Sequence, residues 1–388
     1  MAVESTNNPL SGLWKSTHIE KLFYGPDSVK KHLLSALPSE SSKAFILTGA
    51  SLATKTSLIK QVEELLGSKH HAGTFADIKQ HAPVAQLDRA TEAVTNDSTI
   101  DTIISVGGGS PIDSAKAISH RVHEKAGKYL YHITIPTTLS AAECTMAAGY
   151  TSSDGLKIGV ASPELVPHVI LYDALFARET PQKLWLSTGL RAVDHAVELM
   201  YHPTAAELPT KTMALSAVER LFKYLRLSKR DPRDLDVITQ LQLAAYASLG
   251  FYGLNIQGPL GLSHVLGYAL GSPYGIPHGV TSCLTLGHVV KLKAASDPAS
   301  AAPQIARMLP LVKEGGAGRT GSDNATDDAR EVGDEILRLV QDLGLKTTLT
   351  ELGVGQDQAK VVAKRATGGK EEGDEVFESV LGLVKGLY

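Results

Sequence analysis

Residues 185–203 read WLSTGLRAVDHAVELMYHP. Their apolar side chains recur at the spacing of one helix face, at Leu190, Val193, Val197 and Met200. Ser187 or Thr188 suits the first position of that helix, because a hydroxyl group there accepts a hydrogen bond from a free backbone N–H. Arg191 and His195 are four residues apart and share one side of the helix. The stretch therefore predicts a helix that presents a cation and an imidazole together.

A second stretch, GLSHVLGYALGSPYGIPHGV at 261–280, carries two more histidines. His264 and His278 are fourteen residues apart, and His278 stands in a Pro-His-Gly turn. Imidazole is a common ligand of transition metals, so three histidines and one more polar group in a pocket would suit a divalent ion. A single histidine is more often structural, and only the combination of His195, His264 and His278 favours a shared pocket.

The two stretches together resemble the iron-containing (group III) alcohol dehydrogenase superfamily, whose helix motif reads roughly G-x-D-A-x-x-H-A-x-E. The matching residues are Gly189, Ala192, His195, Ala196 and Glu198. The resemblance implies a metal site made of the aspartate and three histidines, and His195, His264 and His278 match those histidines. The position of the aspartate is occupied by Arg191.

Arg191 changes what the site is expected to bind. A guanidinium is permanently charged and repels a dication, so we expect no catalytic metal. If a metal does bind, the three histidines would hold it. Asp194 points about 100° away from the neighbouring His195 on a helix and is not expected to replace the carboxylate. Arg191 is instead suited to a substrate carboxylate, and an ion pair with Asp194 or Glu198 is the alternative.

The composition is that of an ordinary globular protein. The chain has 388 residues, of which 43% are hydrophobic and 20% charged, with room for two domains. A net charge of −3 gives no reason to expect nucleic acid or membrane binding. The two cysteines favour a reducing compartment. With no signal peptide or membrane-length apolar stretch visible, we expect a cytoplasmic protein.

Short apolar runs alternate with helical segments in the first part of the chain. The runs lie at 44–47 (AFIL), 102–106 (TIISV) and 131–135 (YHITI). This alternation predicts a parallel sheet with helices on both faces, which a further run at 166–172 closes. After Pro181 the pattern becomes helical. We therefore place a nucleotide-binding α/β domain at 1–175 and a helical domain at 176–388.

Residues 107–116, GGGSPIDSAK, follow the second apolar run. Glycines let backbone N–H groups approach a pyrophosphate, and a helix N-terminus favours negative charge. The spacing is not G-x-G-x-x-G, and a glycine-rich turn is also common as plain structure. The run is, however, similar to the superfamily's own GGGSxxDxAK. The resemblance assigns cofactor contacts to Gly49, Ser51, Gly107, Gly108, Gly109, Ser110, Asp113, Thr137, Thr138, Leu139, Thr145 and Lys157.

The segment at 136–145, PTTLSAAECT, distinguishes subfamilies. Typical alcohol dehydrogenases of the superfamily look like PTTAGTGSE, and maleylacetate reductases look like the shorter PTTYAGSEMT. The segment aligns with the shorter form without a gap and places Glu143 and Thr145 on its glutamate and threonine. Maleylacetate reductases also tend to lack the metal-binding aspartate. Both features favour the reductases.

Gly49 bears on the choice of cofactor. Family members strict for NAD often have an aspartate just after the strand that ends here at Thr48, where it would contact the adenosine ribose. Gly49 removes that carboxylate and its repulsion of a 2′-phosphate, which Ser51, Thr54 and Lys55 are placed to receive. NADP(H) is therefore expected as well as NAD(H). The alternative is that Gly49 is only a turn residue.

The resemblance covers roughly residues 20–388 and implies a dehydroquinate synthase-like fold. In this fold, α/β plus all-α, a Rossmann-like N-terminal parallel sheet domain is followed by a C-terminal helical domain, with the active site in the cleft between them. It also implies a homodimer that reduces a small acidic enone or carbonyl substrate with NAD(P)H, as maleylacetate reductases do.

Within that reading, Arg191 and the histidines would hold and polarise the substrate. His264, His278 or Tyr268 would supply the proton. Tyr268 stands where the family often has another histidine. The alternative is that Tyr268 is only a packing aromatic residue. Three alternatives remain: a metal-dependent alcohol dehydrogenase, a lyase or cyclase of the dehydroquinate synthase kind, and a binding protein without catalysis.

Overall fold

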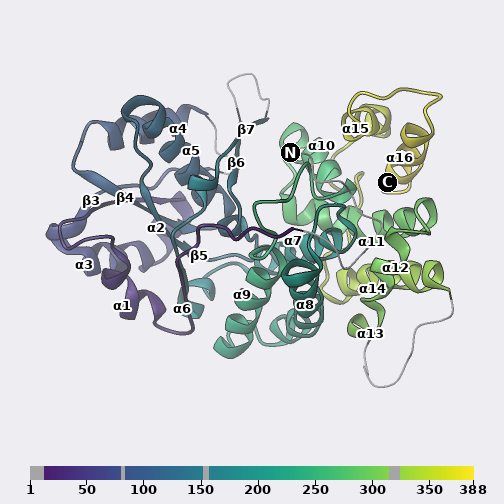
Figure 1. Ribbon diagram of the computed structural model, residues 1–388, viewed down its shortest axis with the longest axis horizontal. Coiled ribbons are helices and arrows are strands. Elements are labelled where there is room, and N and C mark those ends of the chain that lie inside the picture. The colour runs from purple at the N-terminus through teal and green to yellow at the C-terminus, as the bar shows by residue number, and fades with distance from the viewer. Residues whose placement is uncertain (1–12, 80–83, 152–156, 314–323) are drawn as a thin grey trace. The chain divides into compact units, whose positions relative to one another are not determined.

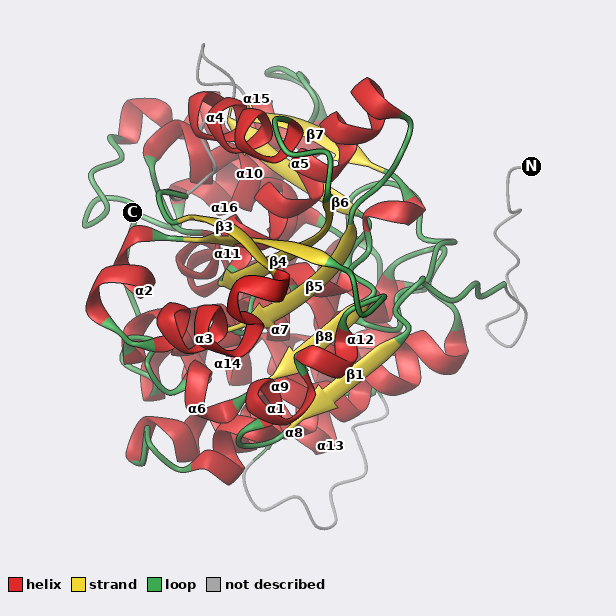
Figure 2. Ribbon diagram, turned by 90° about the vertical axis from the view of Figure 1, so that its left-hand side faces the viewer, coloured by secondary structure: helices red, strands yellow, loops and turns green. Residues whose placement is uncertain are grey.

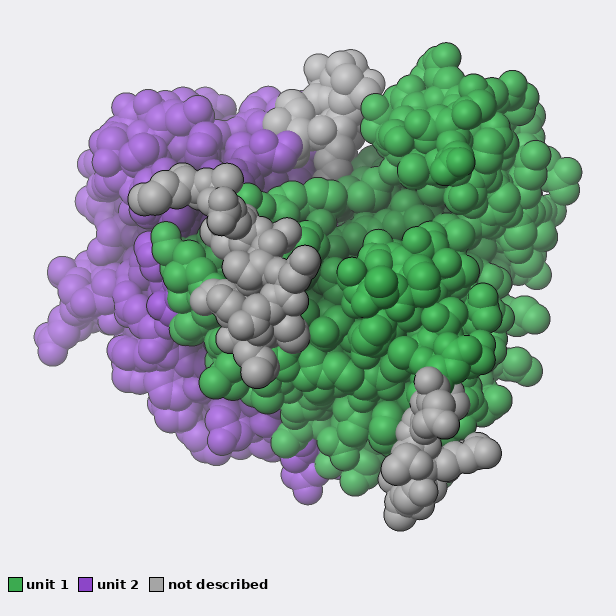
Figure 3. Space-filling model, turned by 45° about the vertical axis from the view of Figure 1, so that its right-hand side comes forward, with its two compact units in different colours: residues 1–15, 182–230, 247–388 green, residues 16–181, 231–246 purple. Residues whose placement is uncertain are grey.

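The computed structural model describes residues 13–79, 84–151, 157–313 and 324–388. The chain forms two compact units (Figure 3). The sheet unit comprises residues 16–181 and 231–246, and the helical unit comprises the chain up to Lys15 together with 182–230 and 247–388. The chain thus passes from the sheet unit into the helical unit after Pro181. The domain boundary near residue 175 stays a prediction.

The sheet unit is built on six strands that all run parallel (Figures 1 and 2). The predicted parallel sheet is confirmed, and the apolar runs form β2, β4, β5 and β8. In spatial order the strands are β1 (Lys21–Tyr24), β8 (Val169–Tyr172), β5 (Tyr131–Pro136), β4 (Ile100–Gly107), β2 (Lys43–Thr48) and β3 (His71–Phe75).

Helices cover both faces of this sheet, because side chains alternate between the faces along each strand. Ile46, Ile104 and Ile133 point to the face that packs against α1 and α3. Phe45 and Ile103 point to the face that packs against α4 and α5. The helices and turns of this unit are α1 (Ser28–His32), η1 (Leu34–Ala36), α2 (Ala50–Lys55), α3 (Leu58–His70), α4 (Val84–Thr95), α5 (Gly109–Ala126), η2 (Ala142–Cys144), η3 (Pro163–Leu165) and α6 (Ala174–Ala177).

The carboxyl ends of parallel strands lie at one edge of the sheet. Because β2, β4 and β5 are neighbours, the loops after them are brought together at that edge. These loops begin at Gly49, Gly108 and Thr137. Beyond them, β6 (Ala147–Thr151) and β7 (Lys157–Ala161) form a separate antiparallel pair.

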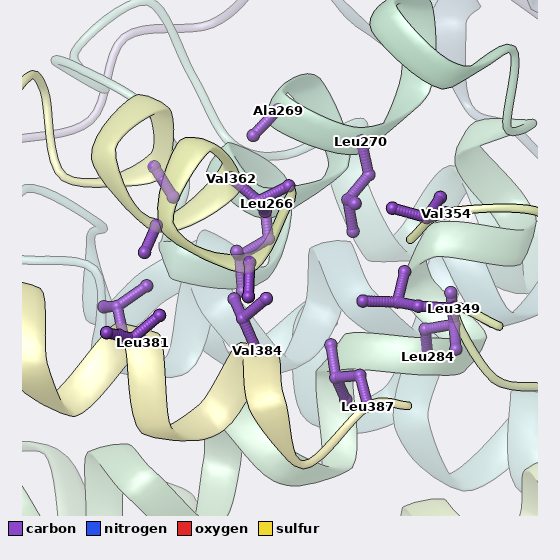
Figure 4. Packing of buried hydrophobic residues seen from close by; sticks show 14 of the residues in the cluster. Leu266, Ala269, Leu270, Leu284, Leu349, Val354, Val362, Leu381, Val384 and Leu387 are labelled. Carbon is purple, nitrogen blue, oxygen red and sulfur yellow. The ribbon is translucent and has the colours of Figure 1, made fainter. Parts of the chain in front are cut away.

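The helical unit has a core where α10, α11, α15 and α16 pack together (Figure 4). Leu266, Leu284, Val362 and Val384 are buried in it. No helix of the described chain is long and apolar enough to cross a membrane. The helices of this unit are α7 (Gln182–Tyr201), the π-helical turn η4 (Glu207–Lys211), α8 (Thr212–Arg230), α10 (Leu262–Tyr274), α11 (His278–Ser296), α12 (Ala301–Ala306), α13 (Leu309–Val312), α14 (Ala325–Asp342), η5 (Gln356–Gln358), α15 (Ala359–Ala366) and α16 (Glu375–Lys385). Most of α9 (Leu235–Leu249) belongs to the sheet unit.

Helix α7 has the predicted apolar stripe of Leu190, Val193, Val197 and Met200, but it does not begin at Ser187 or Thr188 as predicted. All four stripe residues are 0% exposed. The helix begins at Gln182, and the Ser187 and Thr188 hydroxyls donate to Leu184 O at 3.1 and 3.0 Å instead of capping an end. Hydroxyl groups inside a helix commonly turn back in this way to a preceding carbonyl. The polar side of α7 is buried too, because other helices pack around it.

Candidate active site

Helices α7, α10 and α11 pack against one another and carry the predicted catalytic residues. Arg191 and His195 lie on α7, and His264 and Tyr268 lie on α10. His278 is the first residue of α11, after Pro277 at the N-cap, so the Pro-His-Gly turn is the beginning of a helix. All five residues belong to the helical unit.

Arg191 is buried, with 7% of its surface exposed. Its Nη1 atom lies 3.5 Å from Asp194 Oδ2 and 3.4 Å from Ser282 Oγ, both long contacts. Its Nε and Nη2 groups make no hydrogen bond within the described part of the chain. A guanidinium has five N–H donors in a planar fork. Arg191 therefore keeps donors that an anion can use.

Asp194 corrects one expectation. We expected this side chain to point away from His195 and not to replace the metal-binding carboxylate, but its Oδ1 atom is 3.3 Å from His264 Nδ1. Its Oδ2 atom accepts from Ser263 Oγ at 2.8 Å and from Ser282 Oγ at 2.5 Å. His264 comes from another helix, α10, and reaches the side of α7 on which Asp194 lies.

The Asp194 carboxylate is ionised in this setting. Burial by itself would raise its pKa, but His264, Arg191 and the Ser282 hydroxyl together lower it. The ion pair with Arg191 that we kept as an alternative is present at 3.5 Å, although it is buried and not on the surface. Removing either charge would leave the other without full compensation.

Glu198 holds the beginning of α10. Its carboxylate accepts from Ser263 N at 2.7 Å, from His264 N at 3.3 Å and from His264 Nδ1 at 2.7 Å. A Cβ atom on Gly261 would lie 2.5 Å from this carboxylate, so only glycine leaves room for it. The glutamate of the family motif thus fixes the position and the ring orientation of His264.

His264 and His195 lie side by side, but their surroundings shift their pKa values in opposite directions. Their ring centroids are 4.9 Å apart. Burial and Arg191 lower the pKa of His264, but the carboxylates of Asp194 and Glu198 outweigh them and raise it. Burial lowers the pKa of His195 well below its usual value, and His264 and Arg191 add to that effect. The pKa values of the two neighbouring rings are therefore shifted in opposite directions.

Two nitrogen atoms of these rings are buried without a hydrogen-bond partner in the described chain, His264 Nε2 and His195 Nδ1. Buried polar atoms are rarely left in that state. Tyr268 is 45% exposed, and its ring meets that of His278 edge-on at 5.9 Å. The structure thus brings Arg191, His195 and His264 together and pairs His278 with Tyr268.

A resident metal fits these residues poorly. Among the described residues, the one group with metal-ligand spacing is Asp194, Glu198 and His264, whose ligand atoms lie within 4.8 Å of one another. The three histidines do not form such a group. Both Glu198 oxygens and Asp194 Oδ2 already accept from N–H and O–H donors, and the Arg191 cation is adjacent. Asp194 Oδ1 is buried without a hydrogen bond among the described residues and lies 3.3 Å from His264 Nδ1. The group is arranged as a network of ion pairs and hydrogen bonds.

Asp194, Glu198 and Ser263 position the site, but they were not among the predicted site residues. A signal was available, because Asp194 and Glu198 are four residues apart on a helix whose other face is apolar. Carboxylates on such a helix are rarely buried without a cationic partner. That partner, His264, lies 66 residues from Glu198 in the sequence, so periodicity could not identify it.

The predicted cofactor residues lie in the sheet unit, most of them at the carboxyl edge of the sheet. Gly107, Gly108, Gly109 and Ser110 join β4 to α5, and Gly107 has a φ of 139°, which favours glycine. A Cβ atom on Gly108 would lie 3.0 Å from the side chain of Thr138. The glycine loop is therefore packed directly against the loop after β5.

The loop after β5 contains three more predicted cofactor residues. Thr137 N donates to Gly107 O at 2.9 Å, Thr138 is 6% exposed and Leu139 is fully buried.

The remaining predicted contacts are more scattered. Gly49 precedes α2, and a Cβ atom there would lie 3.1 Å from Ile78 O, so a close approach of backbone also explains this glycine. Ser51 is exposed on α2. Asp113 lies on α5, and its Oδ1 atom is 3.7 Å from Lys116 Nζ.

Two of the predicted contacts stand apart from the rest. Lys157 begins β7, but its side chain lies outside what the structure describes. The hydroxyl of Thr145 is bound by Lys116 at 2.9 Å. The roles of all these residues in binding a cofactor stay predictions.

Comparisons with known proteins agree with this architecture. Residues 20–174 match the family described as iron-containing alcohol dehydrogenase, and residues 185–376 match the C-terminal part of the Fe-containing alcohol dehydrogenase family. The chain belongs to the iron-containing alcohol dehydrogenase superfamily and is an NAD(P)-dependent oxidoreductase.

Relatives within this superfamily include several maleylacetate reductases. Maleylacetate reductase 2 of Cupriavidus pinatubonensis is 30% identical to this chain. The match covers 65% of this chain and 66% of that enzyme, just under two thirds of its length. The maleylacetate reductase of Sphingobium indicum is 27% identical over 87% of this chain and 86% of its own. The crystal structure of maleylacetate reductase from Agrobacterium tumefaciens has a TM-score of 0.78, is 24% identical, and covers 97% of this chain and 98% of its own. The predicted superfamily and fold are confirmed.

Proposed function

We propose that this chain is an NAD(P)H-dependent reductase of a small acidic enone or carbonyl substrate, of the maleylacetate reductase kind, that works without a catalytic metal. One observation carries the proposal: Arg191, a buried cation with unused donors, stands where the superfamily motif has a metal-binding aspartate. The similarity to maleylacetate reductases supports it.

Arg191 binds a carboxylate of the substrate. Its Nε and Nη2 groups form the planar fork that accepts the two oxygens of a carboxylate through parallel hydrogen bonds. The Nη1 contacts with Asp194 and Ser282 hold the guanidinium in place. A neutral substrate leaves these donors unpaired in a buried site, so the site selects for an acid.

Reduction of an enone needs a hydride at one carbon and a proton at the other, while charge builds up on the carbonyl oxygen. Bound NAD(P)H supplies the hydride. The imidazolium of His264, held by Asp194 and Glu198, stabilises the negative oxygen together with Arg191. His264, His278 or Tyr268 then supplies the proton. The hydride and the proton balance the reaction.

The cofactor site of the proposal is the glycine loop 107–110 with Thr137 and Thr138. The 18-residue helix α5 begins within this loop, at Gly109, and its N-terminus favours the negative charge of a pyrophosphate. Gly49 leaves room for the 2′-phosphate of NADP(H), so both NADP(H) and NAD(H) are candidates. The homodimer and the cytoplasmic location stay predictions.

The first experiment measures metal content and NADPH binding on one purified sample, beside an Arg191→Asp variant. We expect wild type to bind NADPH, to contain no stoichiometric metal, and to oxidise NADPH with maleylacetate in the presence of a chelator. We expect the variant to gain a metal ion and to lose that activity. Wild type that carries a metal needed for turnover would instead support a metal-dependent alcohol dehydrogenase.

Two other outcomes would contradict the proposal. A protein that oxidises no NAD(P)H with any enone, keto acid or aldehyde tried is not a reductase of this kind. Substrate consumption without net oxidation of NAD(P)H would point to a lyase or cyclase of the dehydroquinate synthase kind.

A further inference from the structure

Lys116, on α5, is the one lysine among the described residues that is completely buried. Lysine is almost never fully buried unless it is paired. Its Nζ atom donates to Ala142 O at 2.6 Å, to Thr145 Oγ1 at 2.9 Å and to Ala147 O at 3.0 Å. An ammonium group has three N–H donors, so each donor has a partner. Lys116 therefore has no donor left for a ligand, and its role must lie in what it holds.

The three partners of Lys116 belong to one segment, residues 137–147. The beginning of this segment is fixed by the hydrogen bond from Thr137 N to Gly107 O. A Cβ atom on Gly109 would lie 3.4 Å from Ser140 Oγ and 3.7 Å from Ala142 Cβ. The glycine loop and this segment thus lie in contact, and Lys116 ties the far end of the segment to the helix that begins with the glycine loop.

The segment contains a strained residue next to the first partner of Lys116. Ala141 has a φ of 53°, in the left-handed region that alanine rarely adopts. Such a conformation persists only where the surrounding structure imposes it, and it is common at functional sites. The bond from Lys116 to the carbonyl of the adjacent Ala142 is one of the contacts that impose it.

Thr145 is part of the same arrangement. Its hydroxyl accepts from Lys116 and has a single proton to donate, for which Ala142 O at 3.2 Å and Ala147 O at 3.1 Å are the acceptors. A hydroxyl group bound in this way has no proton for a phosphate or ribose oxygen. Thr145 therefore differs from Thr137 and Thr138, with which it was grouped.

We propose that Lys116 is a positioning residue for the nucleotide cofactor: it holds segment 137–147 against the glycine loop, with Thr145 as its support and not as a cofactor ligand. The inference rests on the placement of NAD(P)H on the glycine loop proposed above. Loss of the Lys116 ammonium weakens cofactor binding without touching the residues proposed to bind the substrate.

The test compares Lys116→Met, Thr145→Val and Thr145→Ser with wild type. The dissociation constant of NADPH is measured by its fluorescence, and the KM for maleylacetate is measured at saturating NADPH. We expect Lys116→Met and Thr145→Val to raise the dissociation constant about 10- to 100-fold, because each removes a hydrogen bond to a charged group. Thr145→Ser keeps the hydroxyl and should restore binding. The KM for maleylacetate should stay unchanged.

Ser119→Ala is the matched control. Ser119 is also buried on α5 and accepts a hydrogen bond from Leu130 N, outside segment 137–147. This variant loses a buried hydrogen bond on the same helix, so it reports general destabilisation. It should bind NADPH as wild type does. Equal weakening by Ser119→Ala and Lys116→Met would overturn the proposal.

Amide hydrogen exchange of the cofactor-free protein separates positioning from direct contact. Cys144 N donates to Ala141 O at 3.0 Å and Thr145 N donates to Ala142 O at 3.3 Å. We expect faster exchange of both amides in Lys116→Met and Thr145→Val. Weaker NADPH binding by Thr145→Val with unchanged exchange would make Thr145 a direct ligand and overturn its supporting role.

The failure of the two proposals can be told apart. Wild type that binds no NADPH contradicts the proposed function, while exchange in the cofactor-free protein still decides whether Lys116 holds the segment. If wild type and the Lys116→Met variant bind NADPH with the same affinity, only the inference about Lys116 is contradicted. If Lys116→Met does not fold, the NADPH dissociation constants of Thr145→Val and Thr145→Ser decide whether the inference holds.

Discussion

Lys116 in the sheet unit and Arg191 in the helical unit are both buried cations within recognisable motifs, but they are held in different ways. Lys116 uses its three donors at 2.6–3.0 Å on its own chain. Arg191 has two contacts at 3.4 and 3.5 Å, both through Nη1. Under the two proposals, the number of unused donors, more than burial or motif position, separates a positioning cation from one that can bind a ligand.

The carboxylates beside the two cations differ in the same sense. Burial raises the pKa of Glu143, and the Tyr172 hydroxyl and Lys116 offset this only in part. Burial also acts to raise the pKa of Asp194, but His264, Arg191 and Ser282 reverse the effect and lower it. The network around Arg191 therefore depends on a full negative charge, whereas the network around Lys116 is held mainly by neutral oxygen atoms.

The largest effect should come from Arg191→Met, measured as kcat/KM with maleylacetate and with its methyl esters. Removing one partner of a buried charge pair costs about 2–5 kcal/mol, so we expect a loss of about 30- to several-thousand-fold for the acid. The esters lack the charge and should lose little. Arg191→Lys should recover only part of the activity, because an ammonium cannot form the paired bonds. Equal losses for acid and ester would break the comparison with Lys116.

A second effect, of comparable size, concerns the unfolding free energy and not the activity. Asp194→Asn leaves His264 and Arg191 without one of their counter-charges and should lower the unfolding free energy by about 3–5 kcal/mol. Glu143→Gln keeps an oxygen acceptor for the Tyr172 hydroxyl, which lies 2.6 Å from Oε1, and should cost about 1 kcal/mol. Urea denaturation measures both. Similar losses would show that the two networks depend on charge to the same degree.

The pH dependence of stability should have opposite signs in the two units. Burial lowers the pKa of His132 in the sheet unit, and Lys116 and His168 add to the effect. The unfolded chain then binds more protons than the folded chain below about pH 6.5. This position should lose about 1.4 kcal/mol of stability for each pH unit below that value. The measurement is the unfolding free energy of wild type and His132→Gln between pH 5 and 8; parallel curves would contradict it.

His264 provides the opposite slope. Its raised pKa means that the folded chain keeps a proton that the unfolded chain releases above about pH 6.5. The stabilisation is complete below that value and is lost as the pH rises through the pKa of the folded state. The difference between wild type and His264→Gln, in a buffer with chelator, should therefore shrink toward alkaline pH.

The smallest effect is expected for Tyr268→Phe. The tyrosine is 45% exposed and touches His278 through its ring, which phenylalanine keeps. Stability should change by less than about 0.5 kcal/mol. A general acid typically contributes about 10²- to 10⁴-fold to the rate. A loss of kcat in that range would make Tyr268 the proton donor. A smaller loss of kcat would leave His264 and His278 as the candidate proton donors.

The sequence predicted the parallel sheet and the apolar stripe of α7 because both depend on local periodicity. It also predicted the glycine loop and its neighbour after β5, since parallel topology brings together the loops after adjacent strands. It failed at the start of α7, where the buried hydroxyls of Ser187 and Thr188 bond back within the helix. It also failed for Asp194, because helix geometry says nothing about the partner helix.

What the sequence alone determined is the superfamily, the two-part architecture and the presence of a cation at position 191. These follow from short patterns and single residue identities. Only the tertiary structure decided which groups each charged side chain contacts. Ser263 donates a hydrogen bond to Asp194, 69 residues away in the sequence, and Lys116 donates one to Ala147, 31 residues away. Hydrogen bonds and ion pairs depend on distances of a few tenths of an ångström between elements that are far apart in sequence, and packing sets those distances.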